Sequence, residues 1–378
     1  MTSIPGSGLL RWAEVNVAAL RRNAAAFRQY LPDSTRLLVM VKSNGYGHGA
    51  EIAARAAVEG GADWLGVYAP DEALALRAAG FNVPILIVGW SAPSLHPELI
   101  EQKVDITVFD TASIGMLSAN AAAVGQRARV HVKVDTGLGR LGVREEQLAD
   151  VQMVLEREQK HLDVCGLFTH FAVAESDAEF TREQHGRFLE SVDVLRPVMP
   201  EALLHTSGSA AILNFPEMHH DMVRLGIAYY GYAPAGAATS LDLRIAMTVL
   251  ARIAQVKTVA AGDSVGYGRT WRASSRRCIA TVAIGYGQGL PRALSNRGTI
   301  VVHGAMCPIV GTVSMDQVTV DVSDVAGVRE GTEAMYFGVH DAAKLGADAV
   351  ASAVNTIPHE ILCAVADWVP RLPVEADL

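Results

Sequence analysis

Short apolar runs alternate with amphipathic stretches along the chain from residue 12 to about residue 230. The runs are rich in β-branched residues and end at turn or polar positions, a pattern that predicts buried β-strands. They occupy residues 37–42, 64–68, 85–89, 106–109, 129–135, 164–170, 203–207 and 223–230. The stretches between them, such as 51–60, 71–80 and 144–160, end in Gly or Lys, as helix C-termini often do.

Eight apolar strands that are separated by helices fit a closed parallel (β/α)8 barrel better than an open sheet. We therefore predict an α/β fold in which residues 10–238 form a TIM-like barrel. The least regular link lies between the seventh and eighth strands, where the expected helix over residues 209–215 is short.

The pattern changes after about residue 238. Short apolar runs separated by Gly and Asp turns predict strands at residues 246–260, 277–284, 299–303, 306–310, 318–322 and 334–337, and a single clear helix at 347–354. We expect residues 239–378, which residues 1–9 can join, to form a second, mainly β domain of ordinary domain size.

Composition narrows the partners and the compartment. The 378 residues include 32 basic and 40 acidic residues, for a formal net charge of -8, and the Lys and Arg residues are scattered, which argues against a nucleic-acid partner. Because no uninterrupted apolar run has membrane-spanning length and no basic, apolar leader is recognised, we expect a cytoplasmic protein that stays away from membranes. The four cysteines are far apart and form no CxxC, which argues against a metal site and a disulfide framework.

Lys42 is the sharpest candidate for chemistry. It directly follows the first apolar strand and precedes a turn with Gly45, Gly47 and Gly49, whose lack of a side chain lets backbone approach a ligand closely. Active sites of (β/α)8 barrels lie at the C-terminal ends of the strands, where a partly desolvated lysine has a lowered pKa and acts as an imine-forming amine or a general base. A solvated lysine at a strand end is the alternative.

Charged residues also close the fifth predicted strand. Lys133 and Asp135 are two positions apart and so point to the same face, and Arg140 follows in a Gly-rich loop where its guanidinium can form a fork with a carboxylate. A structural salt-bridge network explains this group equally well at this point.

Weaker candidates lie on the last three predicted strands and beside them. His170 ends the sixth strand and Arg224 begins the eighth, with a core histidine and an ordinary ion pair as the alternatives. Ser209 and the amides of Gly226 and Ile227 can donate to a phosphate, although Ser and Gly are also common at helix starts. Taken singly, the Gly-flanked tyrosines of the β domain are ordinary aromatic residues of turns. These residues indicate a function only in combination with the other candidates.

In combination these residues match a known family. From residues 12–16 to residues 369–371 the chain resembles bacterial alanine racemases, which are fold type III pyridoxal phosphate enzymes. The central motif covers residues 41–49 and reads VKSNGYGHG, with the lysine, the tyrosine and the His-Gly pair where the family has them. The resemblance implies a (β/α)8 barrel joined to a β domain, pyridoxal 5'-phosphate as the cofactor, and a head-to-tail homodimer whose sites use both subunits.

The resemblance also implies catalytic roles. Lys42 holds the cofactor as an imine and is the base on the D-alanine face, and Tyr267, from the partner subunit, is the base on the L-alanine face. Inversion at Cα is most directly achieved by removing a proton from one face and returning one on the other, so two positioned bases suit the reaction. Arg224, with His170 as its neighbour, donates a hydrogen bond to the pyridine nitrogen, and because a guanidinium does not readily give up its proton, the cofactor is a weaker electron sink.

The remaining matches concern the phosphate, the substrate and the way into the site. Four residues match the phosphate cradle, through a side chain or a backbone amide: Tyr46, Ser209, Gly226 and Ile227. Arg140 and the backbone amide of Met315 match the contacts to the substrate carboxylate, and Lys133 stands where many members carry a carbamylated lysine that positions this arginine. The residues that match the entrance corridor are Tyr286, Arg292, Asp316 and His359.

Three positions depart from the family. Gln288 stands where an aspartate is usual, and Gly208 stands where an asparagine commonly precedes the phosphate-binding serine. His359 occupies the place of a tyrosine that touches the phosphate and narrows the entrance, so its shorter ring leaves more room beside the substrate side chain.

The sequence therefore predicts an amino-acid racemase, an isomerase that interconverts L-alanine and D-alanine. The nearest alternative is a racemase of broader or serine specificity, since one altered wall residue shifts discrimination only modestly. Decarboxylases of the same fold type place an acid where Arg224 stands. Non-catalytic pyridoxal phosphate carriers resemble the barrel alone, whereas this chain keeps a β domain with Tyr267.

Overall fold

The computed structural model describes residues 8–234, 236–237, 240–340 and 342–376 of the chain. The chain folds into two compact units, each discontinuous in sequence. The described parts of residues 1–20, 46–52 and 244–378 form the β-rich unit, and those of residues 21–45 and 53–243 form the barrel unit. This division differs from the expected split at residue 238, because a strand near the N-terminus pairs inside the β-rich unit.

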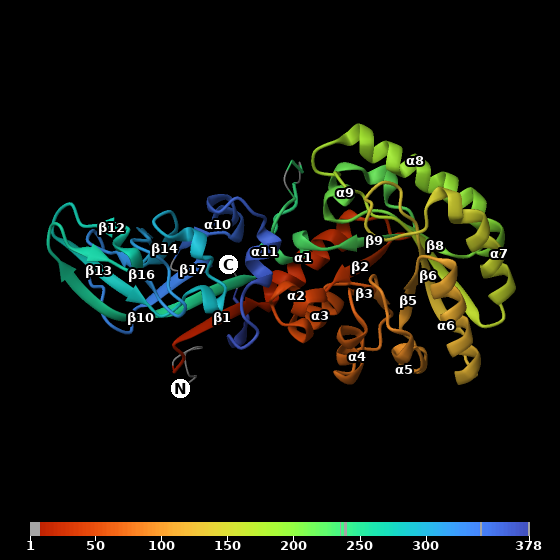
Figure 1. The fold of residues 1–378 in the computed structure, drawn as a ribbon, viewed down its shortest axis with the longest axis horizontal. Helices are drawn as coiled ribbons and strands as arrows, with labels where there is room; N and C mark the ends of the chain where they lie inside the picture. Colours follow the sequence, from red (N-terminus) through yellow and green to blue (C-terminus); the bar gives the residue numbers. More distant parts are fainter. Residues whose placement is uncertain (1–7, 235, 238–239, 341, 377–378) are drawn as a thin grey trace. The chain divides into compact units, whose positions relative to one another are not determined.

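Parallel strands form the sheet of the barrel unit, in the order β8-β7-β6-β5-β4-β3-β2-β9 (Figure 1). Their bounds are β2 (Arg36–Met40), β3 (Trp64–Val67), β4 (Ile85–Ile87), β5 (Asp105–Val108), β6 (Ala128–Lys133), β7 (Leu162–Phe168), β8 (Leu203–His205) and β9 (Met222–Leu225). Past the end of β8, Gly208 bridges Arg224 in parallel, and the Arg224 N–H donates to the Ser207 carbonyl at 2.9 Å, which joins the outer strands. The predicted (β/α)8 barrel is confirmed.

Helices cover the outside of this sheet, as Figure 1 shows for α4 to α8. The helices that begin before α10 are α1 (Val17–Tyr30), the turn α2 (Lys42–Tyr46), α3 (Ala50–Glu59), α4 (Pro70–Ala78), α5 (His96–Glu101), α6 (Thr111–Val124), α7 (Leu148–Glu158), α8 (Ala178–Leu195) and α9 (Ser209–Asn214). Capping carboxylates begin two of them: Asp110 accepts from the Ser113 N–H at 2.6 Å before α6, and Asp177 accepts from the Phe180 N–H at 3.0 Å before α8. As the sequence predicts, α9 is short.

The eighth predicted strand is wrong beyond residue 225. β9 ends at Leu225, and residues Ile227–Tyr230 form a short 3-10 helix, η5, in which the Tyr229 N–H donates to the Gly226 carbonyl at 2.9 Å. The Tyr229 hydroxyl donates to the Ala53 carbonyl at 2.6 Å and is fully buried. The run is therefore apolar because it is packed inside the unit, and an apolar run by itself does not distinguish a strand from a buried helical turn.

The β-rich unit is built on a mostly antiparallel sheet with the order β15-β14-β17-β10-β1-β19, to which β13, β16 and β18 pair at the side. The strands are β1 (Arg11–Asn16), β10 (Met247–Val259), β13 (Arg277–Val282), β14 (Thr299–Val302), β15 (Ala305–Pro308), β16 (Val318–Asp321), β17 (Glu333–His340), β18 (Ala343–Leu345) and β19 (Arg371–Val374), with β11 (Ser264–Val265) and β12 (Trp271–Arg272) as a separate ribbon. Buried Trp12 of β1 packs with Leu250 and Met335, which places the N-terminal strand in this core. The predicted mainly β second domain is confirmed.

The described part of the β-rich unit contains the α-helices α10 (Ala347–Ala353) and α11 (Pro358–Cys363). The sequence predicted α10 and missed α11, because six residues are too few to show a helical period. Pro358 at the first helical position is the local mark of this helix, since proline lacks the N–H that would stay unpaired there.

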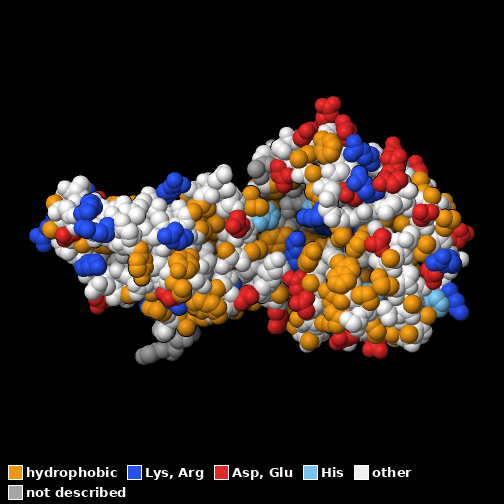
Figure 2. Space-filling view, viewed as in Figure 1, with side chains coloured by type: hydrophobic (Ala, Val, Ile, Leu, Met, Phe, Trp, Pro, Cys, Tyr) orange, Lys and Arg blue, Asp and Glu red, His pale blue; other side chains and the backbone are white. Residues whose placement is uncertain are grey.

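The distribution of charge on one face and the apolarity of the described helices bear on the expected partners. On the face in Figure 2, Lys and Arg side chains are interspersed with Asp and Glu and form no continuous stripe. Within the described residues, no helix combines the length and the apolarity needed to cross a membrane. All four cysteines lie in the described part of the chain, and none of them forms a disulfide there.

One glycine of β7 has no room for a side chain. A Cβ on Gly166 would overlap the Nδ1 of His131 and lie 2.6 Å from its Cε1, and His131 is fully buried. We expect Gly166→Ala to lower the free energy of unfolding by about 1–3 kcal/mol, the usual cost of overpacking a core. Urea unfolding followed by circular dichroism measures this. The matched control is Gly186→Ala in α8, where a Cβ meets no atom within 4 Å and should stabilise the helix by up to about 1 kcal/mol. Equal unfolding midpoints for the two variants would contradict the expectation.

Candidate active site

Lys42 begins a strained turn directly after the first barrel strand. Its successors Ser43, Asn44 and Gly45 have φ values of 53°, 53° and 63°, and Tyr46 has a φ of 49°, so the turn α2 is left-handed. Left-handed backbone costs roughly 1–2 kcal/mol for each residue with a Cβ. Such strain persists only where surrounding contacts hold it, and it is concentrated at functional sites.

Glu72 of α4 supplies one of those contacts. Its carboxylate accepts from the N–H of Ser43 at 2.5 Å, from the N–H of Tyr68 at 2.7 Å and from the N–H of Ala69 at 3.1 Å. The carboxylate therefore ties the turn after β2 to the turn after β3. Sequence reasoning missed Glu72, although a glutamate at the third position of a helix is a known capping signal.

Asp135 shapes the loop that carries Arg140. Its Oδ1 accepts from the N–H groups of Gly137 at 3.1 Å and Gly139 at 3.0 Å, which folds the loop after β6 back on itself. Lys133, the last residue of β6, is 4% exposed, whereas Arg140 is exposed. The motif thus combines an exposed guanidinium with a buried amine.

The amine of Lys133 lies in a cationic environment. Burial and the charges of Arg140, Arg224 and Lys42 lower the pKa of Lys133 to about 8, and Asp135 opposes this shift. A neutral amine is the form that reacts with carbon dioxide or accepts a proton. Lys133 is therefore partly available in that form near neutral pH.

The Arg224 guanidinium is buried between the ends of three strands. Nη1 donates to the His205 carbonyl at 2.8 Å and to the His205 Nδ1 at 2.9 Å. Nη2 donates to the carbonyls of Thr169 at 2.6 Å and Thr206 at 2.8 Å, and lies 3.3 Å from the His170 Nδ1. Burial lowers the pKa of Arg224 to about 9, so the group keeps its proton at neutral pH. These partners are carbonyls and imidazoles, so the ordinary ion pair does not describe this residue.

The contact with Arg224 determines how protons are placed on two further histidines. Because a guanidinium only donates, the His205 Nδ1 accepts, and the Nε2 of neutral His205 donates to the His131 Nδ1 at 2.9 Å. Burial and the Arg224 charge hold the pKa of His205 well below its ordinary value, which keeps this imidazole neutral. The His131 Nε2 lies 3.6 Å from the Asp105 Oδ1. Sequence reasoning missed this buried chain of side chains. Asp105, His131 and His205 are polar residues inside apolar strands, and this could have indicated it.

Four cationic side chains interact electrostatically with His170. Burial, followed by Arg224, Lys133, Arg140 and Lys42, holds the pKa of His170 well below its ordinary value. These cations stand at or beyond the C-terminal ends of barrel strands, which is where such folds bind their ligands. Asp135 is the acidic side chain that acts on Lys133, and it opposes the four cations only in part. The four cations therefore leave an excess of positive charge, which favours an anionic ligand. The donors therefore fit a cofactor with a phosphate and a substrate with a carboxylate.

Three of the four predicted phosphate contacts, Ser209, Gly226 and Ile227, lie in the barrel unit. Ser209 is the first residue of α9, and its Oγ accepts from the Gly226 N–H at 2.9 Å and from the Ala228 N–H at 3.4 Å. Ile227 begins η5 and is buried. A Cβ at Gly208 would lie 3.4 Å from the His170 Cε1, which is ordinary contact, so packing does not require glycine at this position.

The predicted residues of the β-rich unit are mostly exposed. Tyr267 begins the 3-10 turn η6 (Tyr267–Arg269), is 74% exposed, and accepts a hydrogen bond on its carbonyl from the Thr312 hydroxyl at 2.9 Å. Tyr286 and Met315 are exposed as well, as is Arg292. Gly266, just before η6, and Gly268 within it have positive φ angles of 77° and 71°.

Tyr46 and His359 form a pair inside the β-rich unit. Their ring centroids are 5.8 Å apart at 46°. Burial and the neighbouring Cys363 raise the pKa of Tyr46, which keeps its hydroxyl protonated as a hydrogen-bond donor. His359, which stands where the family usually has a tyrosine, thus lies against Tyr46, a predicted phosphate contact in the same unit.

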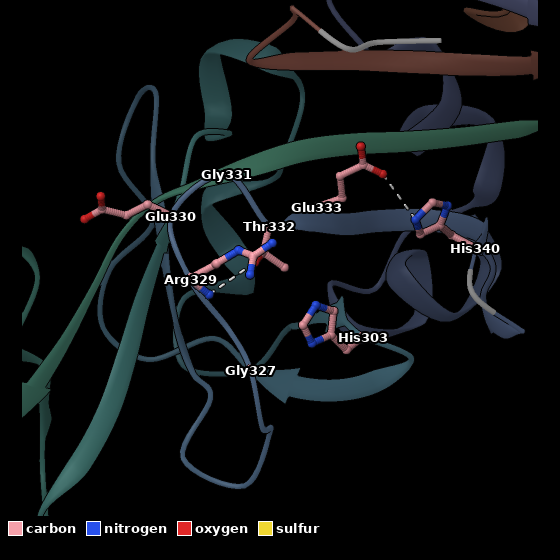
Figure 3. Close-up of a pocket in the computed structure, with 8 residues that line it drawn as sticks. All are labelled: His303, Gly327, Arg329, Glu330, Gly331, Thr332, Glu333 and His340. Carbon is pink, nitrogen blue, oxygen red and sulfur yellow. Dashed lines mark hydrogen bonds and ion pairs between the residues drawn. The ribbon is translucent and has the colours of Figure 1, made fainter. Parts of the chain in front are cut away.

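Figure 3 shows a pocket elsewhere on the β-rich unit. Its lining consists of His303, Gly327, Arg329, Glu330, Gly331, Thr332, Glu333 and His340. The His340 Nε2 lies 3.5 Å from a Glu333 oxygen, and the His303 Nδ1 lies 3.2 Å from the Ala326 carbonyl. This lining includes none of the predicted site residues. Across the described part of the chain, no group of three or more His, Cys, Asp or Glu side chains could hold a metal ion.

A (β/α)8 barrel with cations at its strand ends, joined to a β-rich unit, is the class of protein that the fold and the site define. The family described as alanine racemase, N-terminal domain, matches residues 15–234, and alanine racemase, C-terminal domain, matches residues 246–373. The chain belongs to the alanine racemase family. Alanine racemases are isomerases, so the chain is an enzyme of that class.

Individual relatives cover almost the whole chain. The alanine racemase of Symbiobacterium thermophilum is 39% identical over 95% of this chain and 96% of the relative, and that of Desulforamulus reducens is 41% identical over 96% and 98%. Among solved structures, alanine racemase from Streptomyces lavendulae has a TM-score of 0.93 at 36% identity and covers 97% of both chains. Alanine racemase from Bartonella henselae with covalently bound pyridoxal phosphate has a TM-score of 0.86 at 26% identity over 97% and 99%.

The lowered pKa of Lys133 predicts a pH-dependent stability. The folded pKa of about 8 lies below the ordinary value of 10.5, so the folded state binds fewer protons between these pH values and its stability rises with pH there. Lys133→Met removes this dependence. The free energy of unfolding of the variant minus that of the wild type should therefore be greatest below pH 8. It should fall by about 2–3 kcal/mol on going to pH 10, because the wild type gains stability over this range. Urea unfolding in buffers free of carbon dioxide measures the difference.

The control for this prediction is Lys160→Met, since Lys160 is an exposed lysine. Its stability difference from wild type should stay constant over the same pH range. A constant difference for Lys133→Met as well would show that the buried amine keeps an ordinary pKa.

Proposed function

We propose that the protein interconverts L-alanine and D-alanine with pyridoxal 5'-phosphate held covalently on Lys42. The observation that carries the proposal is the group of four cations that acts on His170 at the strand ends of the barrel. Such a group favours a ligand that combines a phosphate with a carboxylate. Membership of the family and the relative with covalently bound pyridoxal phosphate support the same cofactor.

Two bases act in this proposal. Bound to an amino acid, pyridoxal phosphate supplies an electron sink that makes the Cα proton removable. Lys42 takes or returns the proton on the D-alanine face, and Tyr267 of a second copy of the chain does so on the L-alanine face. Tyr267 is 74% exposed in the single chain, as a base given to the other subunit of a homodimer requires.

Arg224 sets the character of the cofactor site. Both Nη atoms are fixed by carbonyl oxygens, and the guanidinium keeps its proton at neutral pH. In the proposal it donates a hydrogen bond to the pyridine nitrogen without protonating it, next to neutral His170. A pyridine nitrogen held in this way would withdraw less charge than a protonated one, which would disfavour transamination.

The other roles follow the resemblance. In the proposal the phosphate is bound by Tyr46, Ser209 and the amides of Gly226 and Ile227. The substrate carboxylate is bound by Arg140 and the backbone amide of Met315. The entrance corridor is lined by Tyr286, Arg292, Asp316 and His359.

Proton exchange at Cα tests the two-base assignment. Because the enantiomers have equal free energy, any loss of racemisation appears in both directions, so we propose to follow exchange of the Cα proton into deuterated water by NMR for each enantiomer separately. Tyr267→Phe should lower racemisation and exchange from L-alanine by roughly 10²–10⁴-fold while exchange from D-alanine, which uses Lys42, survives. Lys42→Ala should lose both and the visible absorption band of the lysine-bound cofactor.

Three comparisons complete this experiment. Tyr30→Phe, a partly exposed tyrosine of α1, should leave both exchange rates unchanged, and Lys160→Ala should keep the visible band. Unchanged exchange from L-alanine in Tyr267→Phe would overturn the two-base assignment, and retention of optical activity by D-alanine with the wild type would overturn the racemase. Serine and lysine in the same assay test the broader-specificity alternative, which the shorter ring of His359 beside Tyr46 favours.

We also propose that Lys133 is carbamylated. Its lowered pKa leaves amine free to attack carbon dioxide, and the resulting anion would attract the neighbouring Arg140. ¹³C NMR of the wild type in ¹³C-labelled bicarbonate should show a carbamate carbon that is absent in Lys133→Met and present in Lys160→Met. Identical spectra for wild type and Lys133→Met would rule the modification out.

A further inference from the structure

Gln288 is a buried amide that joins two turns of the β-rich unit. It ends the 3-10 turn η7 (Tyr286–Gln288) and is 1% exposed. Its Oε1 accepts from the Gly285 N–H at 2.8 Å, and its Nε2 donates to the Asp316 Oδ1 at 2.8 Å. The amide N–H of Gly285 needs an acceptor and the carboxylate of Asp316 needs a donor, so both contacts require the same orientation of the side-chain amide.

The turn that Gln288 reaches is the one that carries Met315. Its backbone already lies against η7, because the Gly287 N–H donates to the Met315 carbonyl at 2.8 Å and a Cβ on Gly285 would overlap the Ser314 carbonyl. The Asp316 side chain, however, is 60% exposed, and its charged neighbour Arg11 has Nη2 3.9 Å from the Asp316 Oδ1. The hydrogen bond from Gln288, at 2.8 Å, is therefore the shorter of these two contacts of the carboxylate.

We propose that Gln288 is a positioning residue, which binds the Asp316 carboxylate and thereby fixes the 314–317 turn that presents the Met315 amide to the substrate. This inference rests on the proposed function, which assigns that amide to the substrate carboxylate. In this chain the side chain at 288 accepts at one end and donates at the other. An ionised carboxylate in place of Gln288 would accept from Gly285 but repel Asp316.

Gln288→Glu tests the donor. The variant keeps the length of the side chain and the acceptor for Gly285, and places a second carboxylate against Asp316. Two such carboxylates share a proton at low pH, which restores the link, and lose it as the pH rises. We expect the KM for alanine to approach the wild-type value near pH 5.5 and to exceed it by about tenfold near pH 9, with kcat within about twofold.

Adding Asp316→Asn to Gln288→Glu reverses donor and acceptor. The asparagine amide then donates to the glutamate, so the KM should return to within about twofold of that of Asp316→Asn alone and lose its pH dependence. Gln255→Glu is the matched control, because Gln255 is an exposed glutamine of β10, and its KM should follow the wild type at every pH. If the buried charge of Gln288→Glu prevents folding, Asp316→Ala deletes the same contact from the exposed side and should raise the KM several-fold at all pH values.

Amide hydrogen exchange of residues 314–317 in the ligand-free protein gives a readout that does not depend on catalysis. Exchange should be faster in Gln288→Glu above neutral pH and should slow again when Asp316→Asn is added. The positioning role would be overturned if the wild type racemises alanine and Gln288→Glu leaves both the KM and the amide exchange unchanged. If Gln288→Glu does not fold, the same result for Asp316→Ala would overturn it. A wild type that does not racemise alanine would overturn the proposed function and with it the role of the Met315 amide, whereas the exchange result would still decide whether Gln288 holds the turn.

Discussion

The structure of the barrel unit depends on the burial of one cation, the guanidinium of Arg224. An ion removed from water costs several kcal/mol unless its hydrogen bonds are remade. Here the carbonyls of Thr169, His205 and Thr206 remake them, and these carbonyls belong to the ends of β7 and β8 and the residues that follow. The requirement that they converge on β9 helps to join the outer strands of the sheet at the end where the site lies.

The same contact orders the protons around it. Because Arg224 can only donate, His205 must accept from it, which directs the next hydrogen bond toward His131 and the chain toward Asp105. Burial and the charge of Arg224 keep the imidazole of His205 neutral. The cations at the barrel mouth are then opposed by few local acids, and this excess of positive charge is what an anionic cofactor and substrate would neutralise.

In the β-rich unit, a neutral buried side chain holds a turn in place. Asp316 is a carboxylate on an exposed turn, and the amide of Gln288 reaches it from the core without adding charge. In both units, then, a buried side chain with a defined donor end holds the part of the backbone that the proposed reaction needs.

The order of barrel strands and helices, the mainly β second domain and the residues at strand ends could be predicted from the sequence, because side-chain period and turn residues are local properties of the chain. Lys42, Lys133 and Arg224 were found in this way, since each interrupts or ends an apolar run. Only the tertiary structure decided that residues 227–230 are helical, that β1 belongs to the β-rich unit, and that Glu72, His131 and His205 support the site. These features depend on hydrogen bonds and burial between residues that are far apart in sequence, and no local pattern specifies which distant partner satisfies a buried polar group.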